Sequence, residues 1–278
     1  MIIWLASYPK SGNTWLRLFL KAYAQDDDKN FSINKKSDDT FNVEIFPNLS
    51  NFQSMKIQCN GFQNIVENWI KAQKFINSKS KLNFIKTHNA LCTINNFKFT
   101  DKSNTLGGIY IVRDPRDVAV SFGHHIGKSF EEIVDNMIDE KFMISESSFV
   151  QKGFDSTMLS TWSNHFNSWK NYDLNKILII KYEDLVKNTY DEFSRVVKFL
   201  NKLCNLEINN SKILKSIELT SFEKLQLLER SLGFDEKTKS QNFFRKGEVG
   251  SWKNELNRDL SRKIEKSFEN EMITLGYL

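Results

Sequence analysis

The sequence is poor in the residues that build disulfide frameworks, zinc sites and membrane spans. Its three cysteines, Cys59, Cys92 and Cys204, lie far apart and form no C-x-x-C pair, which favours a reducing compartment. No apolar run reaches the ~18 residues that a membrane-spanning helix needs. The amino-terminal region also lacks the pattern of a secretory signal, so we expect a cytoplasmic protein without a membrane span.

An excess of charge of one sign is also missing, and proline is scarce. The 39 Lys and Arg against 34 Asp and Glu give a net charge of only +5, so we expect no nucleic-acid partner. With three prolines and no Gly/Ser-rich tract, the chain offers no linker. Its 278 residues therefore predict a single domain over 1–278.

Short apolar runs alternate with amphipathic segments along the chain. Buried strands are predicted at 2–8, 81–88, 107–114 and in 176–185, and helices at 13–24, from 115 onward and over 189–203. This alternation predicts an α/β fold, a P-loop-like three-layer α/β/α arrangement with a central, mainly parallel sheet. The polar, less regular segments 24–60 and 126–160 are interpreted as surface loops or lids.

Ligands of such folds bind beyond the carboxyl ends of the strands. The predicted strands deliver Lys10, His88, Arg113 and Tyr182 to that edge. The first connection, YPKSGNTW at 8–15, looks like an anion-binding loop: Gly12 permits close backbone approach, and the following helix begins with unpaired amides. Its lysine precedes Gly12, unlike the P-loop of NTPases, in which Lys follows the last Gly. A simple capped turn is the alternative.

Two further segments pair basic side chains with tight turns. IVRDPRDVAVS places Arg113 at a strand end and Ser121 in the next helix, and FFRKGEVGSWK places Arg245 and Lys246 beside Gly247. Arginine suits bidentate phosphate binding. For the first segment the alternative is a weak surface pair, Arg113–Asp117 or Asp114–Arg116. For the second segment the alternative is a solvated loop. Together the three loops indicate a ligand with more than one phosphate-like group.

The motifs SYPKSGNTWLR, VRDPRDVAVS and FRKGEVGSWK together resemble the cytosolic-type sulfotransferases, in family order and across residues 4–253. The resemblance implies use of 3′-phosphoadenosine 5′-phosphosulfate (PAPS) as co-substrate. It implies a 5′-phosphosulfate site formed by Lys10, Ser11, Gly12, Asn13 and Thr14. It implies an adenine site formed by Trp15, Tyr182, Thr220 and Phe222. It also implies a 3′-phosphate site formed by Arg113, Ser121, Arg245, Lys246 and Gly247, with Phe244 also at the nucleotide.

Sulfuryl transfer needs a base for the acceptor and a cation for the leaving oxygen. His88, at the end of a predicted strand, matches the family's catalytic histidine; an ordinary hydrogen-bonded histidine is the alternative. Lys10 would stabilise the leaving phosphate and Lys86 would assist the sulfuryl group, with no metal required. The family's Leu-Pro after the histidine is Asn89-Ala90 here. His165, at helical spacing with tryptophans, is predicted to be core.

A small-molecule hydroxyl or amine is the expected acceptor. The loops 26–60, 89–100, 124–160 and 230–243, including His124 and His125, would build its pocket. The acidic segment with Glu131, Glu132 and Asp135 indicates a cationic or polyhydroxyl acceptor, or else a solvated helix face. Alternative functions are a carbohydrate sulfotransferase, a P-loop nucleotide phosphotransferase and a non-catalytic nucleotide binder. Monomer and homodimer both stay open.

Overall fold

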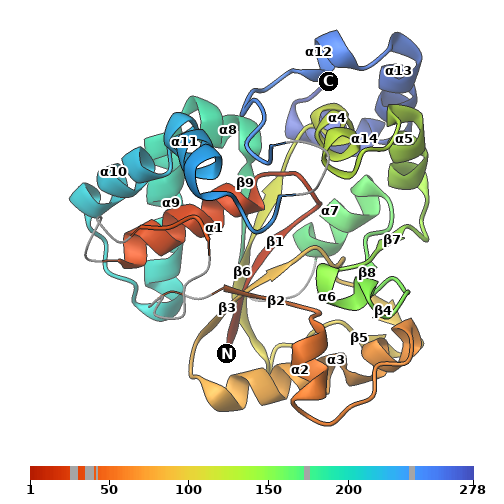
Figure 1. The fold of residues 1–278 in the computed structure, drawn as a ribbon, viewed down its shortest axis with the longest axis vertical. Helices are drawn as coiled ribbons and strands as arrows, with labels where there is room; N and C mark the ends of the chain where they lie inside the picture. The colour runs from red at the N-terminus through yellow and green to blue at the C-terminus, as the bar shows by residue number, and fades with distance from the viewer. Residues whose placement is uncertain (26–30, 35–40, 42, 172–175, 238–241) are drawn as a thin grey trace.

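The computed structural model describes residues 1–25, 31–34, 41, 43–171, 176–237 and 242–278, and it is built around one parallel sheet (Figure 1). The strand order is β2-β3-β1-β6-β9. The strands are β1 (Ile2–Ser7), β2 (Val43–Ile45), β3 (Asn83–Thr87), β6 (Thr105–Val112) and β9 (Ile177–Lys181). The predicted strands are confirmed to within about two residues. Sequence reasoning missed β2, because three residues inside a polar segment carry no readable period.

Helices cover both faces of the sheet, which confirms the three-layer prediction (Figure 1). Along β1, Ile3 and Leu5 pack toward one layer, whereas Ile2 and Trp4 pack toward the other. The first layer holds α1 (Asn13–Ala24), α8 (Tyr182–Lys187), α9 (Thr189–Cys204) and α10 (Asn210–Leu219). The second holds α3 (Phe62–Lys79), α4 (Pro115–Ile126), α5 (Phe130–Ile138), α7 (Trp162–Lys170), α13 (Arg258–Ser267) and α14 (Glu269–Leu275).

The segments interpreted as loops contain more regular structure than expected. Helix α5 lies inside 126–160 because Ile133, Val134 and Met137 bury one apolar face. The remaining elements are α2 (Leu49–Gln53), α6 (Ser147–Val150), α11 (Phe222–Leu232), α12 (Trp252–Glu255) and two antiparallel pairs, β4 (Thr93–Ile94) with β5 (Phe97–Lys98) and β7 (Met143–Ile144) with β8 (Thr157–Met158). Residues 26–30 and 35–40 of the other segment lie outside the described residues.

An aromatic cluster joins the sheet to α7. Trp4 is fully buried, its ring centroid lies 5.3 Å from that of Phe99 and 6.5 Å from that of Trp169, and its indole N–H donates to the Thr105 hydroxyl at 2.9 Å. Interlocked aromatic rings of this size bury a large apolar area and fix the position of the helix that carries them. Helix α7 is therefore held firmly beside the carboxyl ends of β1 and β6.

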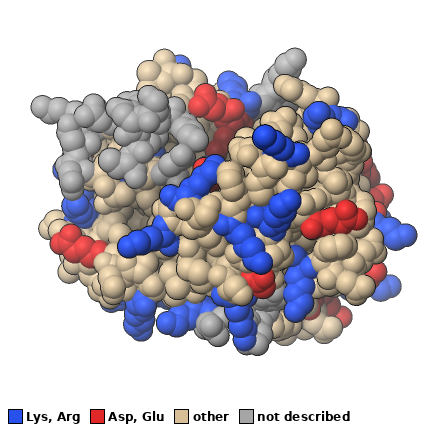
Figure 2. All heavy atoms as spheres, turned by 90° about the horizontal axis from the view of Figure 1, so that it is seen from below, with Lys and Arg blue, Asp and Glu red and all other residues tan. Residues whose placement is uncertain are grey.

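On the face drawn in Figure 2, Lys and Arg side chains are spread over the coloured surface, and Asp and Glu side chains lie among them. Within the described ranges, no helix is both long and apolar enough to cross a membrane.

Candidate functional site

A cavity of about 1130 Å³ lies at the carboxyl edge of the sheet. Every predicted catalytic and nucleotide-binding residue lines it except Ser11, whose side chain is fully buried, whereas His124, predicted at the acceptor pocket, does not line it. The lining residues among them are Lys10, Gly12, Asn13, Thr14, Trp15, Lys86, His88, Arg113, Ser121, Tyr182, Thr220, Phe222, Phe244, Arg245, Lys246 and Gly247. Segments separated by more than 200 positions thus meet around one space.

The loop between β1 and α1 requires a glycine at one position. Gly12 has φ 105°, and a Cβ there would lie 2.6 Å from Cδ2 of Tyr182. Only glycine tolerates both the left-handed backbone and the close ring. Lys10 also has a positive φ, 65°, and the Asn13 side-chain amide donates to the Leu5 carbonyl at 2.9 Å, which ties the start of α1 back to β1. The loop is therefore held in a conformation that presents its backbone to the cavity.

Arg113 links the loop after β1 to the loop that carries Gly247. Its guanidinium donates to the Lys10 carbonyl at 3.2 Å and to the Glu248 carbonyl at 2.9 Å, and it lies 4.3 Å from the centroid of the Tyr182 ring. Its Nε is buried and has no hydrogen-bond partner among the residues that the structure describes. The structure shows no Arg113–Asp117 pair among the described residues: the Asp117 carboxylate accepts the amides of Gly250 and Trp252 instead.

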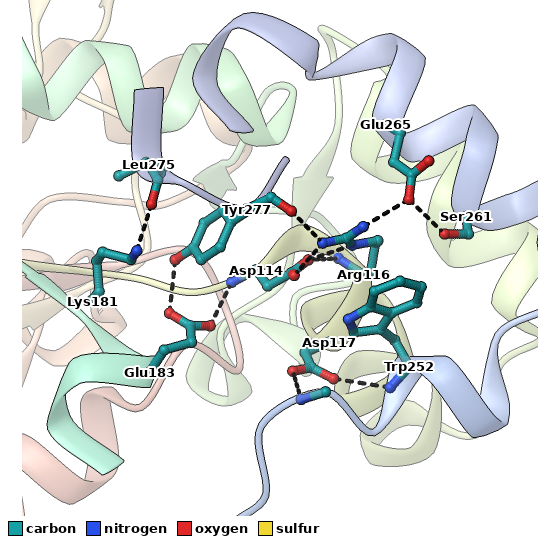
Figure 3. Close-up of polar contacts among 11 residues, drawn as sticks. Asp114, Arg116, Asp117, Lys181, Glu183, Trp252, Ser261, Glu265, Leu275 and Tyr277 are labelled. Atoms are coloured by element: carbon teal, nitrogen blue, oxygen red, sulfur yellow. Dashed lines mark hydrogen bonds and ion pairs between the residues drawn. The ribbon is translucent and has the colours of Figure 1, made fainter. Parts of the chain in front are cut away.

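That loop is held at its two ends by carboxylates that sequence reasoning did not assign. At one end, Glu229 of α11 accepts the amides of Phe243 at 2.7 Å and Phe244 at 2.9 Å. At the other, Asp117 of α4 accepts the amides of Gly250 at 2.7 Å and Trp252 at 3.0 Å (Figure 3). Carboxylate-to-amide bonds of this kind are charge-assisted and strong.

A buried network braces the start of α4 against the carboxyl-terminal segment (Figure 3). Arg116 pairs with Asp114 at 2.7 Å and Glu265 at 2.7 Å, and it donates to the Tyr277 carbonyl at 2.8 Å. Glu183 accepts the Asp114 amide at 2.9 Å and the Tyr277 hydroxyl at 2.8 Å. The Asp114–Arg116 pair exists, but it is buried, not the weak surface pair considered from the sequence.

Cations concentrate around the cavity. Burial, together with repulsion from Arg113 and Lys86, lowers the pKa of Lys10 to about 7. Acidic residues also line the cavity, and one of them, Glu236, accepts from Arg17 at 2.7 Å and from the Thr14 hydroxyl at 3.2 Å. Burial alone would raise the pKa of Glu236, but attraction to Arg17 and Lys86 outweighs it and lowers the pKa to about 2. Sequence reasoning missed Glu236, which follows a turn with no motif of its own.

Arg245 and Lys246 lie at the cavity but share a partner. Glu255 accepts from Arg245 at 3.0 Å, from Lys246 at 2.7 Å and from His124 at 2.5 Å. Burial favours the neutral acid, yet the hydrogen bonds from Lys246, His124 and Arg245 lower the pKa of Glu255 to about 2. An anionic ligand that binds Arg245 and Lys246 would therefore contact two side chains that Glu255 already holds close together.

His88 follows β3 and lines the cavity with a defined ring state. Its Nδ1 lies 2.7 Å from the Ser7 carbonyl oxygen, which can only accept, so Nδ1 carries the proton and Nε2 the lone pair. Burial and the neighbouring charge of Lys86 lower the pKa of His88 well below its usual value. The following Asn89 is buried; its side chain donates to the Ala90 carbonyl and accepts the Met158 amide at 2.9 Å.

Another wall of the cavity combines apolar and polar side chains. Its apolar residues are Ile45, Phe122, Ile126, Phe142, Met143, Ile144, Val150 and Phe243, and its polar residues are His125, Lys128, Asn136, Ser145, Glu146, Ser147 and Asp155. Glu131, Glu132 and Asp135 do not line it; Glu132 pairs with Lys128 and Asp135 with Lys263. The predicted segment 89–100 contributes no lining residue, and 26–30, 35–40 and 238–241 lie outside the described residues.

A family model described as "Sulfotransferase domain" matches residues 2–276. The chain belongs to the sulfotransferase family. It is a transferase by that membership, as the sequence predicted. It is 32% identical over 179 residues to Cytosolic sulfotransferase 12 of Arabidopsis thaliana, covering 61% of this chain and 51% of that one. It is 27% identical to Sulfotransferase 1E1 of Bos taurus over 96% of this chain and 82% of that relative.

Solved structures of sulfotransferases share the fold. The mouse sulfotransferase SULT7A1, complexed with PAP, superposes with a TM-score of 0.62 at 21% identity, over 98% of this chain and 84% of that one. A retinol dehydratase in complex with retinol and PAP gives a TM-score of 0.60 at 20% identity, over 98% and 81%. Within the described residues, no group of three or more His, Cys, Asp or Glu side chains is placed to hold a metal ion.

The role of Asp117 can be tested by hydrogen exchange. Asp117→Ala removes the acceptor of the Gly250 and Trp252 amides, so exchange at both amides should accelerate at least tenfold. Asp135→Ala, which breaks an exposed pair, is the matched control and should leave both unchanged. Unaltered exchange in Asp117→Ala would show that other contacts hold the loop.

Proposed function

We propose that this sulfotransferase uses PAPS and transfers its sulfuryl group to a hydroxyl or amine of a small molecule. The observation that carries the proposal is the meeting of Lys10, Lys86 and Arg113 beside a neutral His88 in one cavity. PAP in the complexes of relatives of the same fold supports the same nucleotide. When bound, PAPS supplies the sulfuryl group together with a phosphate that leaves as an anion.

The donors around the cavity fit such a nucleotide. Three buried donors at or beside the cavity have no partner among the described residues: the Ser11 hydroxyl, the Trp15 indole N–H and Nε of Arg113. Leaving buried donors unpaired costs ~1–3 kcal/mol each, so a ligand that accepts from them gains affinity. We assign the first to the 5′-phosphosulfate side, the second to the adenine side and the third to the 3′-phosphate side. Phe244, to which no contact with the nucleotide is assigned, would hold the loop before α12 in place by packing.

His88 would act as the general base. Its Nδ1 proton is committed to the Ser7 carbonyl, so Nε2 is the nitrogen that can take a proton from an acceptor. The lowered pKa keeps the ring neutral at pH 7, and therefore ready to accept. Lys10 would place its ammonium at the leaving oxygen and Lys86 would stabilise charge on the transferring group.

The rival P-loop phosphotransferase needs an acidic side chain free to bind magnesium at a strand end. Glu183, which follows β9, accepts from the Asp114 amide and the Tyr277 hydroxyl instead. This weighs against the phosphotransferase. A carbohydrate acceptor is a second candidate, while the mixed wall of apolar and polar side chains suits an acceptor with an apolar body and polar groups. The single domain over 1–278, the cytoplasmic location and the oligomeric state stay predictions.

Replacing the base should separate turnover from binding. His88→Ala should lower kcat by about 10²–10⁴-fold, the usual contribution of a general base. His88→Asn is the sharper variant, because its amide N–H can still donate to the Ser7 carbonyl while Nε2 is gone. Both variants should bind adenosine 3′,5′-bisphosphate within about twofold of the wild type in calorimetry. Loss of nucleotide binding in both would make His88 structural.

Nucleotide affinity should depend on pH through Lys10. An anion raises the pKa of this ammonium from about 7, so binding takes up a proton and weakens as pH rises above 7. Between pH 7.5 and 9.5 the nucleotide phosphates are fully ionised, and Kd should rise by up to about tenfold per pH unit. Lys10→Arg stays charged throughout and should flatten the profile. A flat wild-type profile would contradict the assignment.

A further inference from the structure

Helix α7 binds the backbone that follows β3, the segment that carries the proposed base. Three side chains on one face of α7 contact successive residues of this segment. Nε2 of His165 lies 2.9 Å from the His88 carbonyl oxygen, the Trp169 indole donates to the Asn89 carbonyl at 3.1 Å, and the Ser168 hydroxyl accepts the Leu91 amide at 3.0 Å. The spacing of residues 165, 168 and 169 places them together on the helix.

The contact to His88 has a fixed direction. A carbonyl oxygen only accepts, so Nε2 of His165 must carry its proton. Nδ1 of the same ring lies 2.8 Å from the Tyr110 hydroxyl and must then accept, so Tyr110 donates. The ring is fully buried and its centroid lies 5.2 Å from that of Tyr8. Burial lowers the pKa of His165 to about 4, so the ring is neutral at pH 7.

This chain of contacts joins two histidines of opposite tautomer. The His88 carbonyl sets the tautomer of His165, Tyr110 of β6 donates to the remaining ring nitrogen, and His165 holds the carbonyl of His88. The ring of His88 in turn donates from Nδ1 to Ser7 of β1. The backbone of the base is therefore fixed on one side by α7 and its ring on the other by β1, which leaves Nε2 as the unprotonated nitrogen.

We propose that His165 is a positioning residue for the reaction, which keeps the His88 ring in its Nδ1-protonated state at the cavity. It does not touch the reacting atoms; it acts through the His88 carbonyl. This inference rests on the proposed role of His88 as base. It predicts that an apolar side chain such as leucine, which can fill the core but cannot donate a hydrogen bond, does not replace His165. A side chain that donates a hydrogen bond to the His88 carbonyl from the same position does replace it.

The variants that test it differ in the donor they offer. His165→Leu removes the N–H, His165→Gln offers an amide N–H near the position of Nε2, and Tyr110→Phe removes the donor that holds Nδ1 of His165. Ser168→Ala is the matched control on the same face of α7, because it removes the contact to Leu91 and leaves that to His88. We expect kcat to fall about 10–100-fold in His165→Leu and severalfold in Tyr110→Phe, with recovery in His165→Gln and little change in Ser168→Ala.

Nucleotide binding and the histidine ring states give readouts that a packing defect alone would not move. The Kd for adenosine 3′,5′-bisphosphate should stay within about twofold in folded variants. Long-range ¹H–¹⁵N spectra of the four histidines should show His88 as an Nδ1-protonated neutral ring and His165 as an Nε2-protonated neutral ring in the wild type. The His88 signal should shift toward a mixture of tautomers in His165→Leu and return in His165→Gln.

Two outcomes would overturn the proposal. One is a His165→Leu variant with wild-type kcat, whatever its thermal stability. The other is an unchanged His88 tautomer signal in that variant. Failure of the proposed function is distinct, because the wild type would then show no sulfuryl transfer from PAPS while the ring states could still be read.

Discussion

The site depends on the burial of several cations at one edge of a parallel sheet. Lys10 and Arg113 lie there with Lys86 of the neighbouring strand, because the strands that carry or precede them run in the same direction side by side. Like charges brought out of water repel and lose hydration, which costs free energy. In the rest of the site, carboxylates and backbone carbonyls accept hydrogen bonds from cationic side chains, and neighbouring histidines stay neutral, which together offset that cost.

The carboxylates divide this task by position. Glu236, which follows α11, pairs with Arg17 near the loop after β1. Glu255 pairs with the basic side chains of the loop before α12. Asp117 and Glu229 accept hydrogen bonds from backbone amides, and thereby hold that loop in place. The proposed anionic ligand would bind to cations that the fold has already oriented, so it would order few side chains on binding, which favours affinity.

The local motifs predicted the lining residues that are assigned to the nucleotide and the reaction, because several of these motifs span a strand end and the turn that follows it. Strand order then brings those turns together, and the rule for the carboxyl edge of a parallel sheet anticipated this. The partners that hold the motifs were not predictable. Asp117 reads as an ordinary acid in the first turn of a helix, since the amides it accepts lie 133 and 135 positions away. His165 reads as core, and it is core, but its contact to His88 spans 77 positions.

The nucleotide preference of the full chain tests the central claim most directly. Thermal unfolding should be followed with adenosine 3′,5′-bisphosphate in the presence of EDTA, and separately with Mg-ATP. A ligand at 100 times its Kd adds ~2.7 kcal/mol of stability, which raises the Tm by roughly 5–10 °C in a chain of this size. The account predicts such a rise with the bisphosphate without magnesium, and a smaller one with Mg-ATP. A rise with Mg-ATP alone would contradict it.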